Sequence, residues 1–69
     1  MKLDLHGIKH ANVSKELDTF LFKYLQTKNL QVEVVTGKSS AMKKIVKELL
    51  VDYNLEVTRE LEGSLIIDL

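Results

Sequence analysis

Two stretches of apolar residues at helical spacing, separated by short strand-like segments, constrain the fold of this chain more than any other feature. The first stretch predicts a helix over 13–28, with Asn12 as its N-cap and Asn29 at its C-terminal end. The second carries an apolar stripe over 42–53 and ends at Asn54, a residue that tolerates the left-handed conformation. Each helix has one apolar stripe, so each needs one apolar surface to cover.

Short apolar segments frame these helices and predict four strands. The first begins at Leu3 and ends before Gly7, and the others cover 31–35, about 55–58 and 65–67. The order βαβαββ implies parallel pairing with right-handed crossovers in the first two units and an antiparallel hairpin at the end. We therefore expect an α/β chain, an α+β two-layer sandwich with both helices on one face of a mixed four-stranded sheet.

The length and composition predict one small domain, residues 1–69, without disulfide cross-links. It has no cysteine, which excludes disulfides and thiolate metal sites. The charges of its ten basic and ten acidic residues cancel, which argues against a protein that binds nucleic acid through net positive charge alone. No apolar run approaches the roughly 20 residues of a membrane helix, and no secretory signal is recognisable. We expect a cytoplasmic, stand-alone protein without a membrane partner, and assume a monomer.

Asp4 and His6 form the first candidate site. Residues two apart on a strand share a face at a separation of roughly 7 Å, near enough to hold one phosphate or water between them. Imidazole exchanges protons near neutral pH, and a neighbouring carboxylate orients it. We interpret the two residues as a catalytic pair followed by a turn at Gly7. The alternative is a polar strand face that ends in an edge histidine.

The segment Thr36-Gly37-Lys38-Ser39 forms the second candidate site, at the carboxyl end of the next parallel strand. Ligands of open α/β sheets bind at this edge, so both candidates should meet there. Gly37 permits a sharp turn, and a cap at Ser39 or Ser40 opens the second helix. Free N–H groups at a helix start attract anions, and Lys38 adds a positive charge. We predict a phosphate site; the alternative is an ordinary turn with an exposed lysine.

Three lysines extend this site along the second helix. Lys43, Lys44 and Lys47 fall on the side away from the apolar stripe and form, with Lys38, one local basic cluster. We predict that the cluster contacts phosphates; the alternative is a solvated helix face. His10 is expected in the following loop, exposed and without a role. No metal site or cofactor is predicted from the ligand spacing, and a divalent ion for catalysis is left open.

Segments 3–7 (LDLHG) and 36–39 (TGKS) resemble the two motifs of the Smr (small MutS-related) domain. In that family the motifs are LDLHG and HGxG or TGxG, and the resemblance covers essentially the whole chain. It implies a βαβαββ sandwich similar to the C-terminal domain of bacterial translation initiation factor three. The chain departs at Ser39, where the motif has glycine. It also carries about three extra loop residues over 9–11 and a short turn over 60–63, where members usually have a longer Gly-rich loop.

The resemblance implies action on DNA or RNA, with nicking or RNA-cleaving activity in some members and binding alone in others. It assigns catalysis to Asp4 and His6 and backbone contact to 36–39. Our leading hypothesis is a weak or structure-selective phosphodiester endonuclease. One alternative is a nucleic-acid-binding module without chemistry. The other is a protein-interaction adaptor that keeps only the fold and exposes an apolar patch on the uncovered sheet face. The residues expected to bind phosphate are Gly7, Thr36, Gly37, Lys38, Ser39, Ser40, Lys43, Lys44 and Lys47.

Overall fold

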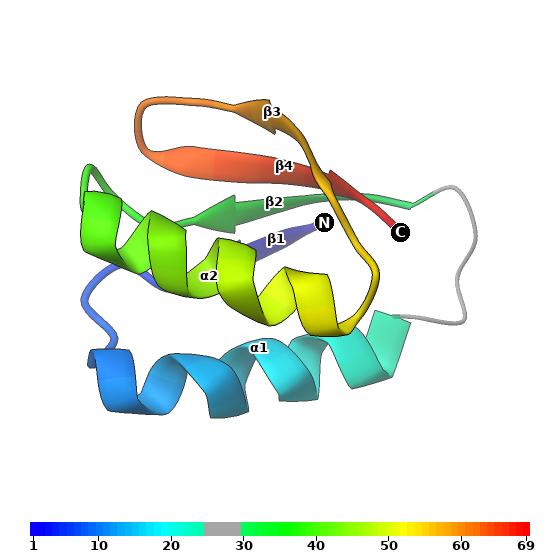
Figure 1. Ribbon diagram of the computed structural model, residues 1–69, viewed down its shortest axis with the longest axis horizontal. Helices are drawn as coiled ribbons and strands as arrows, with labels where there is room; N and C mark the ends of the chain where they lie inside the picture. Colours follow the sequence, from blue (N-terminus) through cyan, green and yellow to red (C-terminus); the bar gives the residue numbers. More distant parts are fainter. Residues whose placement is uncertain (25–29) are drawn as a thin grey trace.

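Strands and helices alternate along the chain in the predicted order. The computed structural model describes residues 1–24 and 30–69, and Figure 1 shows both helices on the same side of one sheet. The fold class predicted from the sequence is therefore confirmed. The elements are β1 (Lys2–Asp4), α1 (His10–Tyr24), β2 (Gln31–Val35), α2 (Ser40–Asp52), β3 (Val57–Glu60) and β4 (Ser64–Asp68).

The sheet has the strand order β1-β2-β4-β3. β1 runs parallel to β2, and β4 is antiparallel to both β2 and β3. The predicted C-terminal hairpin is thus confirmed. β4 lies between β2 and β3, so the two strands joined by α2 share a direction without pairing. The parallel pairing predicted for the first unit is confirmed, and the one predicted for the second unit is wrong. Because β3 runs in the same direction as β1 and β2, the β3–β4 turn lies at the same end of the sheet as the loops that follow β1 and β2 (Figure 1).

Alternating apolar residues along the two central strands separate the core from the uncovered face. Val32 and Val34 of β2, and Leu65 and Ile67 of β4, are fully buried beneath the helices. Period-two alternation puts the intervening residues on the other face of the sheet. Both helices present their stripes to the same layer, which closes a single core. Its members are Leu5, Val13, Leu17, Leu21, Val32, Val34, Met42, Val46, Leu50, Leu65 and Ile67.

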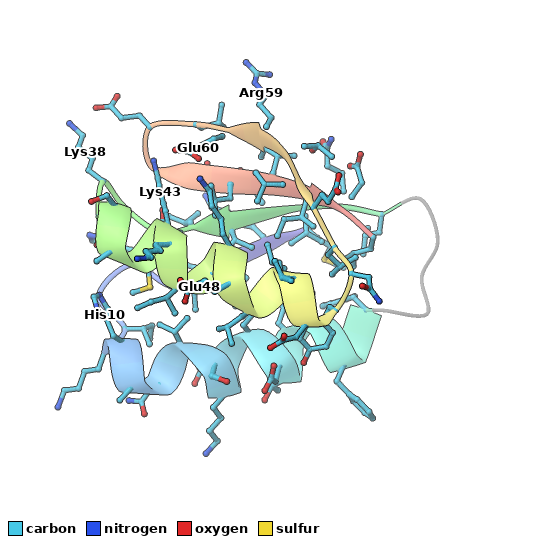
Figure 2. The ribbon with its side chains drawn as sticks, viewed as in Figure 1. His10, Lys38, Lys43, Glu48, Arg59 and Glu60 are labelled. Carbon is cyan, nitrogen blue, oxygen red and sulfur yellow. The ribbon has the colours of Figure 1, made fainter. Side chains whose placement is uncertain are left out.

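The uncovered face of the sheet is largely polar. The register aligns Lys2, Glu33, Ile66 and Arg59 in one row across the four strands, and Figure 2 shows Arg59 pointing away from the helices. Three of these four residues are charged, and Ile66 is half-buried. This row gives no support to the apolar patch that the adaptor interpretation predicts.

The start of α1 differs from the prediction. The helix begins at His10, and the backbone N–H of Asn12 donates to the carbonyl of Lys9 at 2.8 Å. Asn12 therefore lies inside the first turn, and its prediction as the N-cap is wrong. The expected extra loop over 9–11 is wrong for the same reason, because residues 10 and 11 are helical. The predicted end of this helix, at 25–29, lies outside the described residues.

The end of α2 follows the prediction closely. Asn54 has φ +57°, its N–H donates to Val51 O, and the N–H of Leu55 donates to Leu50 O, both at 3.0 Å. These two bonds make a Schellman motif, in which a left-handed residue ends the helix. Because Leu55 is part of this cap, β3 begins two residues later than predicted, at Val57.

Candidate nucleic-acid interface

A tight turn follows β1 and exposes His6. The N–H of Ile8 donates to the carbonyl of Leu5 at 3.0 Å, and Gly7 has φ +83°. A turn of type II requires such a positive φ at its third residue, where glycine is favoured. No atom lies within 4 Å of the place a Cβ would take on Gly7. Glycine is therefore needed here for its conformation and not for space.

Asp4 holds the main chain of His6. Its Oδ1 accepts a hydrogen bond from the backbone N–H of His6 at 2.9 Å, an arrangement in which aspartate fixes the backbone two residues later. Both side chains are exposed. Among the contacts of the described residues, the Asp4 carboxylate makes no hydrogen bond to the imidazole. Asp4 thus positions His6 through the backbone.

The loop between β2 and α2 combines a left-handed glycine with a helix cap. Gly37 has φ +70°, and the buried Thr36 donates from Oγ1 to the Gly37 carbonyl at 2.9 Å. Ser39 accepts a hydrogen bond from the N–H of Met42 at 3.1 Å, and Ser40 is the first helical residue. Ser39 has φ −74° and ψ 112°, an extended backbone open to any residue. The serine that departs from the family motif is therefore unstrained and is the predicted N-cap.

The His6 imidazole lies directly against Gly37. A Cβ built on Gly37 would approach Cδ2 of His6 to 3.0 Å, closer than side chains normally come. The two candidate segments, about 30 residues apart in sequence, therefore meet at one edge of the sheet, as the sequence predicts. Figure 2 shows Lys38 projecting from the same end of the molecule. We call the surface formed by His6, Gly37 and Lys38 the loop edge.

The β3–β4 turn is hydrogen-bonded to the loop edge. The carbonyl of Gly63 accepts hydrogen bonds from the N–H groups of both Thr36 and Gly37, each at 3.0 Å, and the turn is closed by a bond from Leu61 N to Ser64 O at 2.8 Å. This contribution could not be predicted from the sequence. Its only sequence signal is the turn-forming Gly63, which says nothing about a partner 26 residues earlier.

Lys38 and Lys44 keep their side chains in solvent. Lys38 Nζ lies 3.0 Å from Oε1 of Glu62, and both side chains are mostly exposed, so this pair contributes little to stability. It does place a carboxylate beside the cation of the loop edge. Lys44 is exposed and makes no ion pair within the described part of the chain.

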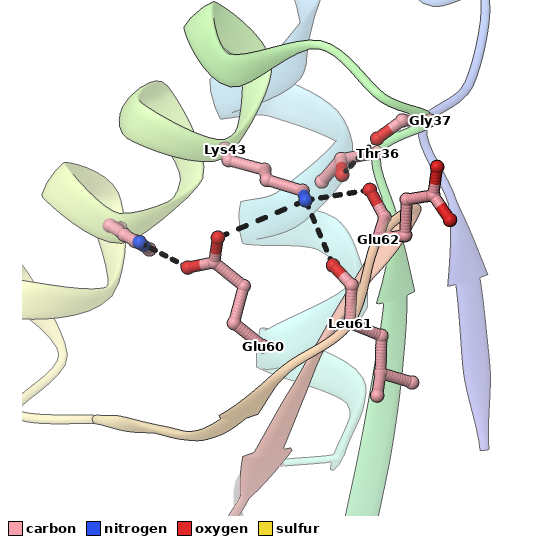
Figure 3. Close-up of polar contacts among 7 residues, drawn as sticks. Thr36, Gly37, Lys43, Glu60, Leu61 and Glu62 are labelled. Carbon is pink, nitrogen blue, oxygen red and sulfur yellow. Dashed lines mark hydrogen bonds and ion pairs between the residues drawn. The ribbon is translucent and has the colours of Figure 1, made fainter.

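Lys43 does not lie on the solvent side of α2, and that prediction is wrong. Its side chain is only 13% exposed, and Nζ donates to the carbonyls of Leu61 at 2.8 Å and Glu62 at 2.7 Å (Figure 3). Lys43 lies one helical turn before the buried Val46, so it borders the apolar stripe. Its methylene stem follows that stripe while the ammonium reaches the hairpin.

Lys47 is also turned toward the hairpin, where it pairs with the Glu60 carboxylate. A hydrogen bond from Lys47, then its positive charge, and finally the charge of Lys43 lower the pKa of Glu60 from its ordinary value. Figure 2 shows Lys43 and Glu60 pointing toward each other across the gap between α2 and β3. The predicted four-lysine cluster is therefore divided, with two lysines at the hairpin and two in solvent.

Within residues 1–24 and 30–69, no group of three or more histidine, aspartate and glutamate side chains is placed to hold a metal ion. None of the described helices has the length and apolar character needed to cross a membrane.

Comparison with known proteins identifies the family. No curated protein and no solved structure matches the chain. The family model described as Smr domain matches residues 3–61, a span that contains His6, Gly37 and the β2–α2 loop. The chain therefore belongs to the Smr domain family, and its function is related to nucleic acid.

Proposed function

We propose that this domain binds the phosphate backbone of DNA or RNA at the loop edge and cleaves a phosphodiester bond there. The contact between the exposed His6 imidazole and Gly37 carries the proposal. It places the one proton-exchanging group of the loop edge beside the start of α2, whose first N–H groups favour an anion. Lys38, the residue after Gly37, adds a positive charge at the same end of the molecule (Figure 2). A phosphate bound there would touch both family motifs.

His6 supplies the acid–base chemistry in this proposal. Its imidazole takes the proton of the attacking water or hydroxyl as the new oxygen–phosphorus bond forms. The bond from phosphorus to the leaving nucleotide oxygen then breaks, and that oxygen takes a proton from solvent. Lys38 and the α2 N-terminus stabilise the negative charge on the phosphate during this exchange. Asp4 contributes by holding the His6 backbone.

The experiment is cleavage of end-labelled substrates by the purified chain. RNA and single-stranded, nicked and branched DNA are incubated with wild type, His6→Ala and His10→Ala, each with and without a divalent metal. His10 is the matched control, because it is an exposed histidine near the same end of the molecule (Figure 2). We expect cleavage by wild type and His10→Ala and its loss in His6→Ala. Cleavage that persists in His6→Ala, or is absent from every preparation, contradicts the catalytic role.

A second candidate function is nucleic-acid binding without chemistry. One observation favours it: the Asp4 carboxylate accepts a hydrogen bond from the main chain of His6, and among the contacts of the described residues it makes none to the imidazole. This candidate predicts a gel shift that weakens with salt and is never followed by cleavage. Lys38→Ala and Lys44→Ala should each weaken that shift, since both side chains are exposed.

A further inference from the structure

We propose that Lys43 is a positioning residue for the loop edge, acting through the β3–β4 turn and without touching nucleic acid. It holds the turn, the turn holds Gly37, and Gly37 sets the place of the His6 imidazole. The inference rests on the proposed function, because it concerns how that site is kept in shape. It assigns Lys43 a different role from the phosphate contact expected from the sequence.

The first step is the attachment of the turn to α2. Two of the three ammonium donors of Lys43 are used on consecutive carbonyls, Leu61 O at 2.8 Å and Glu62 O at 2.7 Å. The Glu60 carboxylate lies 3.8 Å away and balances the charge. Figure 3 shows the ammonium enclosed by these three oxygen atoms. Hydrogen bonds from a charged donor are about twice as strong as neutral ones, so Lys43 anchors the turn to the helix.

The second step leads from the turn to the loop edge. Gly63 is the residue after Glu62, and its carbonyl receives both the Thr36 and the Gly37 N–H. A shift of the turn therefore moves or breaks both bonds together. The His6 ring in turn occupies the space beside the Gly37 Cα, because a Cβ built there would lie 3.0 Å from Cδ2. The path from Lys43 to His6 thus consists of contacts between neighbouring groups, with no gap.

Direct phosphate contact by Lys43 is disfavoured by the same geometry. Its side chain is 13% exposed, whereas that of Lys38 is 82% exposed. A phosphate could reach the Lys43 ammonium only if it displaced two carbonyls and a carboxylate. Lys44, the next residue on α2, is exposed and serves as a matched control.

The test measures oligonucleotide affinity between about 0.05 and 0.2 M salt for wild type, Lys43→Met, Lys43→Arg, Lys44→Met and Lys38→Ala. A lysine that contacts phosphate lowers the slope of log affinity against log salt by about 0.7 to 0.9 when it is removed. We expect Lys43→Met to weaken binding by about tenfold, the cost of losing charged hydrogen bonds, with the slope unchanged. Lys38→Ala should lower the slope, and Lys43→Arg, which keeps a donor, should restore most of the affinity.

A second measurement, amide hydrogen exchange, needs no nucleic acid and separates this inference from the proposed function. In Lys43→Met, exchange at Thr36 and Gly37 should accelerate by about tenfold relative to Val34 and Leu65 in the core. Lys44→Met should leave it unchanged. If wild type binds no oligonucleotide, the proposed function fails. Amide exchange at Thr36 and Gly37 in Lys43→Met still tests whether Lys43 positions the loop edge.

Two results overturn the inference. One is a lowered salt slope in Lys43→Met with unchanged exchange at Gly37, which would make Lys43 a phosphate contact. The other is a Lys43→Met variant whose oligonucleotide affinity and Gly37 amide exchange are both the same as in wild type. Should Lys43→Met fail to fold, Lys43→Gln decides, because its amide keeps one neutral donor in place of the ammonium. Exchange at Gly37 should then be faster than in wild type, and unchanged exchange would contradict the anchoring role.

Discussion

Replacing Gly37 by alanine tests the contact on which the site is built. Two costs are expected. The first is the backbone cost of a side chain at φ +70°, about 1–2 kcal/mol. The second comes from His6, whose Cδ2 would lie 3.0 Å from the new Cβ. Turning the ring off its preferred rotamer to relieve that contact costs about 0.5–1.5 kcal/mol.

Gly7 supplies the control for the backbone cost. It has a similar φ of +83° but no atom within 4 Å of an added Cβ. Gly7→Ala should therefore destabilise the domain by the backbone cost alone. Gly37→Ala should be less stable than Gly7→Ala by about 0.5–1.5 kcal/mol, the ring contribution. In a domain of this size, 1 kcal/mol corresponds to roughly 4–8 °C in Tm.

The assay is urea unfolding of wild type, both glycine variants, His6→Ala and the His6→Ala/Gly37→Ala double variant. Without the imidazole the extra contact cannot form, so the cost of Gly37→Ala should fall to that of Gly7→Ala. The double-mutant cycle isolates this coupling free energy. Equal cost of Gly37→Ala with and without His6, within about 0.3–0.5 kcal/mol, would refute the packing of His6 on Gly37.

Two further predictions concern stability. Ser39→Ala removes the cap bond from Met42 N–H and should lower the free energy of unfolding by about 1 kcal/mol. Ser40 is exposed and does not cap the helix, so Ser40→Ala should stay within about 0.5 kcal/mol of wild type. Equal effects of the two substitutions would contradict the cap assignment. The lowered pKa of Glu60 means that its ion pair stabilises the fold above the ordinary glutamate pKa and is lost as the pH falls through the lowered value. Urea unfolding should therefore show wild type more stable than Glu60→Gln near neutral pH, with a difference that shrinks once the pH falls below the ordinary glutamate pKa. A difference that grew on acidification would be inconsistent with this pairing.

The element order could be predicted because apolar periodicity is local. The buried residues Val13, Leu17 and Leu21 recur at helical spacing, and Val32 and Val34 alternate as in a strand. The start of α1 could not be predicted in the same way. Asn12 has a strong capping preference, but after the tight turn at Gly7 the helix begins at His10, three residues earlier than the predicted start at 13.

The two motif segments of the site could be predicted, and so could their meeting at one sheet edge. Parallel strands place their carboxyl ends together, which brings His6 to Gly37. The role of the hairpin could not be predicted, because Lys43 reaches carbonyls 18 and 19 residues away. The identity of a side chain does not reveal which backbone carbonyl it will donate a hydrogen bond to. That partner depends on β4 lying between β2 and β3, which no local pattern specifies.

We propose that nucleic acid binds at the loop edge. The most direct test is an NMR titration of the isotope-labelled chain with a short single-stranded oligonucleotide. We expect the largest shift changes at His6, Gly37 and Lys38. Changes concentrated instead in the hollow lined by Asp18, Thr19, Phe22 and Tyr53, with the loop edge unmoved, would contradict it.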